Sequence, residues 1–160
     1  MKLMASKQTL TKAEYEALAE FRYALRQFQH FSENAARAAG LTPQHHQAML
    51  AIKGFPGRDR ITVGELAERL QIRHHSAVGL TDRLVAERYV RRVPGREDRR
   101  QVQLALTSRG ETILEKLSAA HHEELQRMGP QINRLLMRLR GADSSHSKPI
   151  IQDDAPDKEI

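Results

Sequence analysis

The sequence predicts a mainly α-helical fold that carries one small β-hairpin, an α+β arrangement. Through most of residues 11–140, apolar residues recur at three- and four-residue steps, which is the period of amphipathic helices. Between residues 89 and 107 the pattern becomes strict alternation beside a Pro-Gly pair, as expected for two short strands joined by a tight turn. The chain has 160 residues, a length that suits one domain.

The first expected helix is long. Thr11 and Glu14 match a capping box, in which a hydroxyl and a carboxylate satisfy free amides at a helix start. One apolar stripe then runs as far as Gly40 and comprises Tyr15, Leu18, Phe21, Leu25, Phe28 and Phe31. About 28 helical residues would span about 42 Å, which gives more apolar surface than a small domain needs for its own core. We therefore expect part of this stripe to meet a second chain, with an ordinary core helix as the alternative.

Two shorter helices are expected next. Thr42 caps the first, and Pro43 stands at its first helical position, where the missing amide hydrogen is not needed. This helix ends near Gly54, and residues 54–60 are expected to form a loop. A second capping box at residues 62–65 begins the following helix.

A third short helix is expected over residues 74–87, after a turn at residues 71–73. Its residues Val78, Leu84 and Val85 are expected to face the core. Two short helices across a tight turn form a helix-turn-helix arrangement.

The hairpin is expected at residues 89–106. Val102, Leu104 and Leu106 alternate with Gln and Ala, so one face of the second strand is predicted to be apolar. Five arginines lie in or near the turn, namely Arg91, Arg92, Arg96, Arg99 and Arg100. Clustered guanidinium groups repel each other unless an anion lies alongside, and a nucleic-acid backbone is such an anion.

A long helix is expected after the hairpin, with Thr107 as its cap. The Gly-Pro pair at residues 129–130 is expected to break it, and a last helix covers residues 132–139. Residues 1–10 are expected to be frayed, and residues 141–160 are expected to form a disordered acidic tail.

Charge indicates the kind of partner. The formal net charge is +6 and the isoelectric point is near 10. Residues 141–160 hold five acidic residues and two lysines, a net of −3, so residues 1–140 carry +9. A basic body indicates a polyanionic partner. Aromatic residues make up only 4% of the chain and Trp is absent, which disfavours the stacking surfaces that bind single strands, so double-stranded DNA is the expected partner.

A helix-turn-helix followed directly by a basic ribbon predicts a winged helix-turn-helix. The second helix of such a unit fits the major groove of DNA, about 12 Å wide. The start of helix 74–87 is therefore expected to read bases, and the candidates are Arg73, His74, His75, Ser76, Gly79 and Leu80. Arg83 is expected to contact phosphate, which positions the protein without reading sequence. The alternative is a solvated helix start.

The ribbon would then be the wing. Its cationic candidates for DNA contact are Arg96, Arg99 and Arg100. Asp98 would repel phosphate, so we expect it to fix the shape of the loop by binding an arginine or loop amides. An ordered arginine loses less entropy on binding. The alternative is a solvated basic hairpin.

Several other classes are disfavoured by what the sequence lacks. There is no cysteine, which excludes disulfides and thiolate metal sites. No apolar run approaches the roughly 18 residues of a membrane span, and the N-terminus lacks a signal-peptide core, so a cytoplasmic protein is expected. No phosphate-binding Gly loop, His-Glu-x-x-His or Gly-x-Ser-x-Gly motif occurs, and no enzymatic activity is predicted.

The residues of the wing resemble the signature of the MarR family of bacterial transcription regulators. The matching residues are Asp98-Arg99-Arg100, then Leu106-Thr107 and Gly110. Residues 65–70 and 76–84 are also similar to the helix-turn-helix of that family, and the resemblance covers about residues 11–140. Arg88 stands where the family more often has Gly, which puts the turn before the ribbon in doubt.

The resemblance implies a homodimer whose terminal helices interlock and which binds a palindromic operator. Residues 11–40 and 107–140 would then form the dimerisation region, and residues 42–106 the DNA-binding region. Asp98 would be the carboxylate that orders the loop, and Arg100 the arginine that enters the minor groove. Dimerisation also follows independently, because two winged helices related by a twofold axis read half-sites one DNA turn apart, about 34 Å.

The resemblance also implies a repressor that a small aromatic or phenolic molecule releases from DNA. Candidate residues for such a pocket are Phe28, Phe31, His45 and Met49. The alternative is that these four side chains are simply core.

No metal or cofactor is predicted. Eight histidines include three adjacent pairs, and neighbours on a helix point about 100° apart, so both members of a pair do not easily face one ion. His30, Glu33, His45 and His122 are candidates to converge from different helices, which keeps a metal-responsive regulator as an alternative. A non-specific architectural DNA-binding protein is the other alternative.

Overall fold

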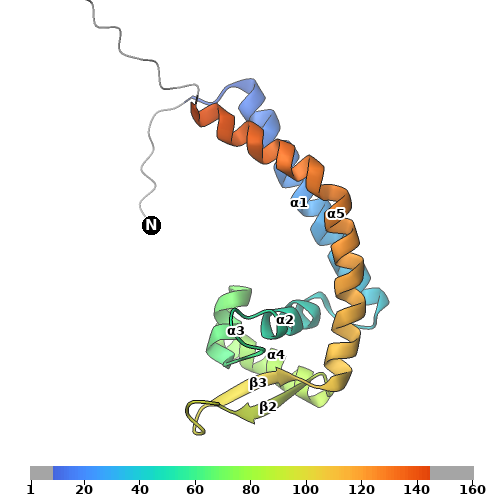
Figure 1. Ribbon diagram of the computed structural model, residues 1–160, viewed down its shortest axis with the longest axis vertical. Helices are drawn as coiled ribbons and strands as arrows, with labels where there is room; N and C mark the ends of the chain where they lie inside the picture. Colours follow the sequence, from blue (N-terminus) through green and yellow to red (C-terminus); the bar gives the residue numbers. More distant parts are fainter. Residues whose placement is uncertain (1–8, 145–160) are drawn as a thin grey trace, which may run out of the picture. The chain divides into compact units, whose positions relative to one another are not determined.

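The computed structural model describes residues 9–144, with side chains as far as residue 141. Figure 1 shows the elements in order: α1 (Lys12–Ala38), α2 (Pro43–Lys53), β1 (Arg60–Ile61), α3 (Val63–Leu70), α4 (His74–Ala86), β2 (Val90–Pro94), β3 (Val102–Leu106) and α5 (Ser108–Ser144). The mainly helical fold with a small sheet confirms the predicted class. The predictions of a frayed start and of a disordered tail fall largely on residues 1–8 and 145–160, which lie outside the described residues. For residues 141–144 the predicted tail was wrong, because they continue α5.

The chain divides into two compact units. One is drawn from residues up to Arg26 and from Met128 onward, and the other is Gln27–Arg127. In the first unit the buried side chains are Ala17 and Ala24 on α1 and Met128 and Leu135 on α5. Each pair is spaced by seven residues, as expected for one face of a helix.

The predicted helix caps are present. The amide of Thr11 donates to Glu14 Oε2 at 2.6 Å, and the amide of Glu14 donates to Thr11 Oγ1 at 3.3 Å. Thr62 and Glu65 form the same reciprocal pair at 2.8 and 3.2 Å. These bonds satisfy amides that the first turns of α1 and α3 leave without helical partners.

The sheet has three antiparallel strands in the order β1-β3-β2. Sequence reasoning treated residues 54–60 as loop and missed β1, whose Arg60 pairs with Ala105 and whose Ile61 pairs with Leu104. Two residues are too short for any periodic signal. Ile61 and Leu104 are fully buried and belong to the core of the Gln27–Arg127 unit.

Two predicted faces were partly wrong. On β3, Val102 is 53% exposed while Gln103 is 7% exposed. Val102 pairs with Pro94 at the far end of the ribbon, beyond the reach of β1, so nothing covers it. On α4, Val78 is exposed, because the buried stripe runs instead through Ala77, Leu80, Thr81 and Leu84. Those positions follow the three- and four-residue spacing of one helix face.

The predicted break at residues 129–130 was wrong. α5 continues from Ser108 to Ser144 with Pro130 inside it. A proline removes one hydrogen bond and strains the preceding turn, but it does not always end a helix. Good helix formers such as Gln, Leu, Met and Arg follow Pro130, and they favour continuation.

The turn before the ribbon keeps a left-handed residue although no glycine is present. Arg88 has φ of 63°, a conformation that glycine adopts more easily than other residues. The Arg88 carbonyl accepts a hydrogen bond from Thr107 Oγ1 at 2.6 Å, which ties this turn to the start of α5. The substitution of the usual glycine therefore leaves the turn in place at a conformational cost.

We expect Arg88→Gly to be more stable than Arg88→Ala by about 1 kcal/mol, because only alanine retains the left-handed strain. Urea unfolding at one fixed protein concentration measures the difference. As a control, the same two replacements at Gln126, an exposed position inside α5, should give the opposite order, since glycine weakens a helix interior by about 1 kcal/mol. Equal stability of the two Arg88 variants would contradict the strain argument.

Candidate nucleic-acid interface

The loop between β2 and β3 is ordered by Asp98. Its Oδ1 accepts a hydrogen bond from the Arg100 amide at 2.9 Å, and its carbonyl accepts one from the Gln101 amide at 3.1 Å. The Gly95 amide closes the loop on the Gln101 carbonyl at 2.7 Å. A Cβ at Gly95 would lie 2.4 Å from the Asp98 carbonyl oxygen, so only glycine fits there. Of the two roles expected for Asp98, the geometry supports binding to a loop amide.

This loop presents its arginines to solvent. Arg99 and Arg100 are exposed, and no ion pair involves either within residues 9–144. Arg96 is exposed as well and lies 3.9 Å from Asp59, a distance that gives a weak pair. Arg92 differs, because it forms an ion pair with Asp82 and so links β2 to α4. The three arginines of the loop, Arg96, Arg99 and Arg100, therefore remain available to an external anion.

The start of α4 is also accessible. Arg73 occupies the N-cap position but makes no capping hydrogen bond, and the first turn contains no acidic residue. His74, His75 and Ser76 are exposed. A helix start with unsatisfied amides and no carboxylate suits an anion such as phosphate.

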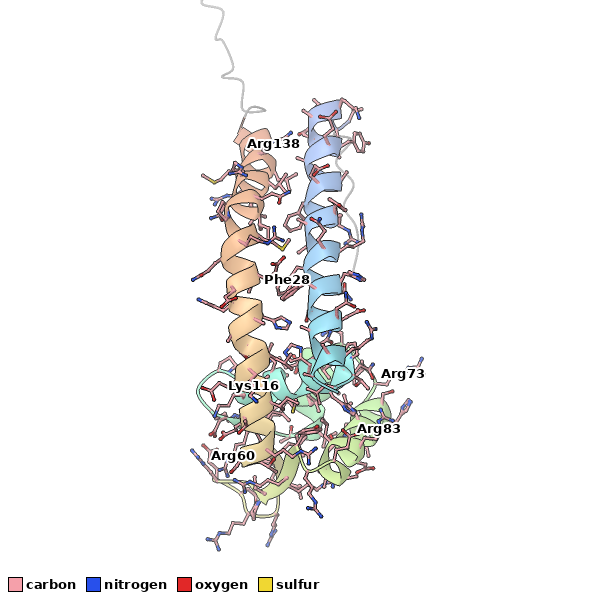
Figure 2. All side chains as sticks on the ribbon, turned by 90° about the vertical axis from the view of Figure 1, so that its right-hand side faces the viewer. Phe28, Arg60, Arg73, Arg83, Lys116 and Arg138 are labelled. Atoms are coloured by element: carbon pink, nitrogen blue, oxygen red, sulfur yellow. The ribbon has the colours of Figure 1, made fainter. Side chains whose placement is uncertain are left out.

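The other candidates on or beside α4 are partly exposed and partly buried. Arg73 and Arg83 are exposed and project outward from the helix (Figure 2). Gly79 is half-buried. Leu80 is only 1% exposed and belongs to the hydrophobic core, so its prediction as a base-reading residue was wrong. The reason is the helical period, since Leu80 lies one turn from Ala77 and Leu84 on the inward face.

A cluster of rings lies where α1, α2 and α5 meet in the Gln27–Arg127 unit. The His121 ring lies edge-on to Phe28 and Phe31, with centroids 5.9 and 5.5 Å away, and 4.7 Å from the His46 ring. His121 Nδ1 lies 2.6 Å from the Leu117 carbonyl, and its Nε2 lies 2.7 Å from Ser32 Oγ. Figure 2 shows Phe28 pointing from α1 toward α5.

Sequence reasoning chose the wrong histidine of the adjacent pair for this cluster. His45 is buried but its Nδ1 lies 3.5 Å from the Glu87 carboxylate at the end of α4. Met49, the other candidate, is fully buried in the core. The structure therefore brings Phe28 and Phe31 together with His46 and His121, and it uses His45 to join α2 to α4. An adjacent pair gives no signal of which ring faces inward.

His46 is buried and its Nδ1 has no hydrogen-bond partner. Burial, reinforced by the nearby His121, lowers the His46 pKa from 6.5 to about 4. A base whose pKa is lower in the folded state favours unfolding when it is protonated. Its neutral form is fully compatible with folding above pH 6.5, and stability is lost as the pH falls from about 6.5 toward 4.

We expect the free energy of unfolding to fall by roughly 1–2 kcal/mol between pH 7 and pH 5 because of His46. Urea unfolding of the wild type and of His46→Phe, which keeps a ring but does not titrate, measures this contribution. The pH dependence should be smaller in His46→Phe. His122→Gln, at an exposed histidine on α5, is the control and should keep the wild-type slope. A His46→Phe profile parallel to the wild type would show that another group is responsible.

The candidate metal ligands do not converge. Within residues 9–144, no group of three or more His, Asp or Glu side chains is placed to hold a metal ion. Glu33 pairs with Arg37 at 3.3 Å, and His122 lies 3.0 Å from Gln126 on the same helix. Over the same residues, no helix combines the length and apolar character needed to cross a bilayer.

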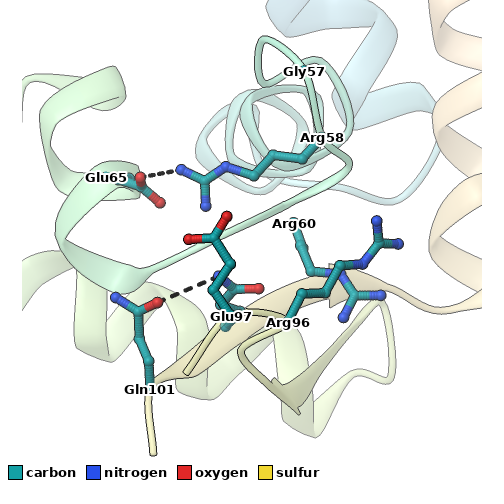
Figure 3. Close-up of a pocket in the computed structure, with 8 residues that line it drawn as sticks. Gly57, Arg58, Arg60, Glu65, Arg96, Glu97 and Gln101 are labelled. Atoms are coloured by element: carbon teal, nitrogen blue, oxygen red, sulfur yellow. Dashed lines mark hydrogen bonds and ion pairs between the residues drawn. The ribbon is translucent and has the colours of Figure 1, made fainter. Parts of the chain in front are cut away.

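A polar cleft of about 480 Å³ lies beside the wing, between the β2–β3 loop and the segment before α3 (Figure 3). Sequence reasoning missed it, because Arg58 and Arg60 come from a segment treated as a plain loop. Arg58 forms an ion pair with Glu65 of α3 and stacks on the Phe55 ring at 4.5 Å. Burial alone would raise the Glu65 pKa, but hydrogen bonds from the Thr62 amide and Arg58 lower it overall.

A helix-turn-helix followed by a three-stranded sheet with an arginine-bearing ribbon defines a winged-helix protein. Comparison with known proteins gives the family. Residues 39–101 match the sequence profile of the MarR family. The HTH-type transcriptional regulator PapX of Escherichia coli is 29% identical over 80 residues, which are 50% of this chain and 49% of PapX. The match therefore spans about half the length of that relative.

Solved structures share the fold. AbsC, a MarR family transcriptional regulator from Streptomyces coelicolor, superposes with a TM-score of 0.65 at 21% identity, over 87% of this chain and 97% of AbsC. A mutant MarR from E. coli, solved in complex with operator DNA, gives 0.59 at 20% identity, over 84% of this chain and 99% of that one. The chain is therefore similar to MarR family regulators over residues 39–101, and it shares their winged helix-turn-helix fold.

Proposed function

We propose that the protein is a homodimeric, sequence-specific DNA-binding transcription regulator. The observation that carries this proposal is the wing loop, in which Asp98 holds the Arg100 backbone while the arginine side chains stay exposed. An acidic residue in a DNA-facing loop has a purpose if it orders its cationic neighbours. The E. coli MarR structure, whose fold this chain shares, is a complex with operator DNA, which supports the same reading.

The start of α4 supplies the second half of the proposed interface. Its exposed histidines and serine offer donors and acceptors to base edges in the major groove. Its uncapped amides, together with Arg73 and Arg83, would hold phosphates. The interface we propose therefore comprises Arg73, His74, His75, Ser76, Gly79, Arg83, Arg96, Arg99 and Arg100, with Asp98 in an ordering role.

Dimerisation accounts for apolar side chains that a monomer leaves in water. On α1, Tyr15 is 57% exposed, Leu18 39% and Leu25 42%. On α5, Leu136 and Met137 are exposed as well. Large exposed apolar surfaces mark interaction sites. We propose that these faces of residues 11–40 and 107–140 form the interface with a second copy.

We expect the double variant Leu18→Glu, Leu25→Glu to weaken the dimer by at least about 100-fold, because burying each leucine contributes about 1.5–3 kcal/mol. Light scattering across a dilution series measures the dissociation constant. Both leucines are exposed in the single chain, so the protomer should keep its helical circular dichroism. Glu20→Lys, an exposed charge change on α1, is the control. An undiminished dimer in the double variant would place the interface elsewhere.

On this proposal the protein acts as a repressor, and a small aromatic or phenolic molecule releases it from DNA. The half-buried Phe28 and Phe31 are the residues we propose for contact with that molecule, because they combine aromatic surface with the polar His121 and Ser32. His45 and Met49 are not included, since both are buried in other contacts. Release of a bound operator by a panel of phenolic molecules, lost in Phe31→Ala, tests this part.

Selection of bound DNA from a random pool tests the main proposal. A specific regulator should recover a palindrome whose half-sites are about one helical turn apart, about 34 Å. Its affinity should fall steeply with salt, with a log–log slope of about −0.9 per phosphate contact. Equal affinity for selected and random DNA would instead favour a non-specific architectural protein.

A further inference from the structure

The cleft beside the wing has unsatisfied polar groups of both kinds. Arg60 Nε is buried without a hydrogen-bond partner, and so is Gln103 Oε1. Both residues line the cleft. They lie on the same face of the sheet, because Arg60 pairs with Ala105 and Gln103 is two residues away on the same strand. A buried polar atom without a partner costs free energy unless water or a ligand satisfies it.

Gln103 has one polar side-chain atom without a partner. Its Nε2 donates to Gln101 Oε1 at 3.4 Å, so one amide hydrogen is engaged within the chain while Oε1 is left without a donor. Gln103 is only 7% exposed, so bulk water does not compensate that oxygen freely. The cleft is therefore lined by a residue whose acceptor has no donor among the described residues.

Glu97 adds a second acceptor, and the arginines add donors. Glu97 lines the cleft and has no ion pair or hydrogen bond among the described residues. In Figure 3 its carboxylate points into the space between Arg58 and Arg60. Arg58 is engaged by Glu65, whereas Arg96 has only the 3.9 Å pair with Asp59. Arg60 and Arg96 are thus the donors that an occupant would meet.

The donors and acceptors of the cleft together favour one class of ligand. A phosphate or a simple carboxylate would satisfy the arginines, but its negative charge would face the Glu97 carboxylate. A simple carboxylate would also leave Gln103 Oε1 without a donor. A simple amine would satisfy the two acceptors, but it would leave the Arg60 guanidinium without an acceptor. A ligand that carries both a carboxylate and an ammonium group satisfies both sets. The volume of about 480 Å³ lies within the range of small-molecule sites.

We infer that this cleft binds an amino acid, with its carboxylate on Arg60 and Arg96 and its ammonium group on Glu97 and Gln103 Oε1. The ligand would join the wing loop to the segment before α3, because Glu97 and Arg96 belong to the loop and Arg60 to β1. An arginine held by the ligand is less available to DNA. This last consequence rests on the proposed DNA-binding function, whereas the binding itself does not.

Calorimetric titration of the full chain with L-glutamate and with glutarate, without DNA, tests the binding. Glutarate has the same five carbons and both carboxylates but lacks the ammonium group. We expect L-glutamate to bind one site per chain, and glutarate to bind at least about tenfold more weakly, which corresponds to about 1.4 kcal/mol. No binding of L-glutamate up to about 10 mM (a free energy near −2.7 kcal/mol), or equal binding of glutarate, would overturn the inference.

Variants of single residues test whether L-glutamate binds in this cleft. Glu97→Gln should weaken L-glutamate by about tenfold but should not weaken glutarate, because glutarate has no ammonium group to contact Glu97 and is relieved of a like charge. Glu97 is exposed on a loop, so the variant should fold. Arg91→Gln, at an exposed arginine of β2 that does not line the cleft, is the control and should change neither affinity. L-glutamate binding that Glu97→Gln leaves intact would refute the assignment.

Operator affinity measured with L-glutamate or with glutarate, at equal ionic strength, tests the consequence for DNA. L-glutamate should lower the affinity more than glutarate does. A protein that binds L-glutamate but no DNA would refute the proposed function and leave the amino-acid site standing. A protein that binds DNA but not L-glutamate would refute the site alone.

Discussion

Replacing Arg100 with alanine is expected to weaken operator binding by roughly 10- to 100-fold, which corresponds to about 1.4–2.8 kcal/mol. The Arg100 side chain is exposed and its backbone is held by Asp98, so the guanidinium is presented without a competing partner among the described residues. Its removal takes a contact from DNA and none from the core. Electrophoretic mobility shift with the selected operator measures the loss, and unfolding by urea should show unchanged stability.

Variants of two neighbouring residues distinguish a specific contact by Arg100 from a general effect of positive charge. Arg99→Ala removes the same charge from the adjacent exposed residue, and it should weaken all DNA sequences similarly while reducing the salt slope by about one. Asp98→Ala makes the protein more positive, and simple electrostatics would then predict tighter binding. We expect weaker binding instead, because the Arg100 amide loses its acceptor and the loop loses order. Tighter binding by Asp98→Ala would show that the carboxylate only repels DNA.

Local chemistry made much of the fold and of the wing predictable. The capping pairs Thr11–Glu14 and Thr62–Glu65 act within one helical turn, so their spacing alone implies their hydrogen bonds. The role of Asp98 was predictable for a similar reason, since its partner is the amide two residues away. Periodic apolar residues located the helices, because a long helix repeats its signal several times.

The features that the sequence did not predict depend on tertiary contacts or on which of two neighbouring residues faces the core. β1 exists only because β3 offers it an edge, so its two residues carry no pattern of their own. On α4, Val78 was expected to face the core and Leu80 to face DNA, and the structure has the reverse. The apolar pattern of a 13-residue helix is too short to fix which face turns inward. His46 rather than His45 faces His121, which depends on how α2 is turned against α5. The cleft joins residues about 40 positions apart, such as Arg60 and Gln103, and no local signal connects them.

Gly110→Ala is expected to have the largest effect on stability, a loss of about 3 kcal/mol or more. Gly110 lies in the first turn of α5, where an added Cβ would stand 2.2 Å from the Tyr89 carbonyl oxygen. Retreat of the helix would relieve the clash, but Thr107 holds it in place. The Thr107 amide donates to that same carbonyl at 3.0 Å, and its hydroxyl donates to the Arg88 carbonyl at 2.6 Å. The methyl group therefore meets backbone that moves only if these bonds break.

Gly141→Ala provides the matched control, because it makes the same change in the same helix, at a position that no proline follows. A Cβ at Gly141 would meet nothing within 4 Å, so alanine should stabilise the helix there by about 0.5–1 kcal/mol. Urea unfolding of both variants, at one protein concentration because a dimer would make stability depend on it, should thus shift in opposite directions. Similar shifts in the two variants would mean that α5 starts farther from Tyr89 than the structure shows. Glycine at position 110 would then need another explanation than this close approach between α5 and the ribbon.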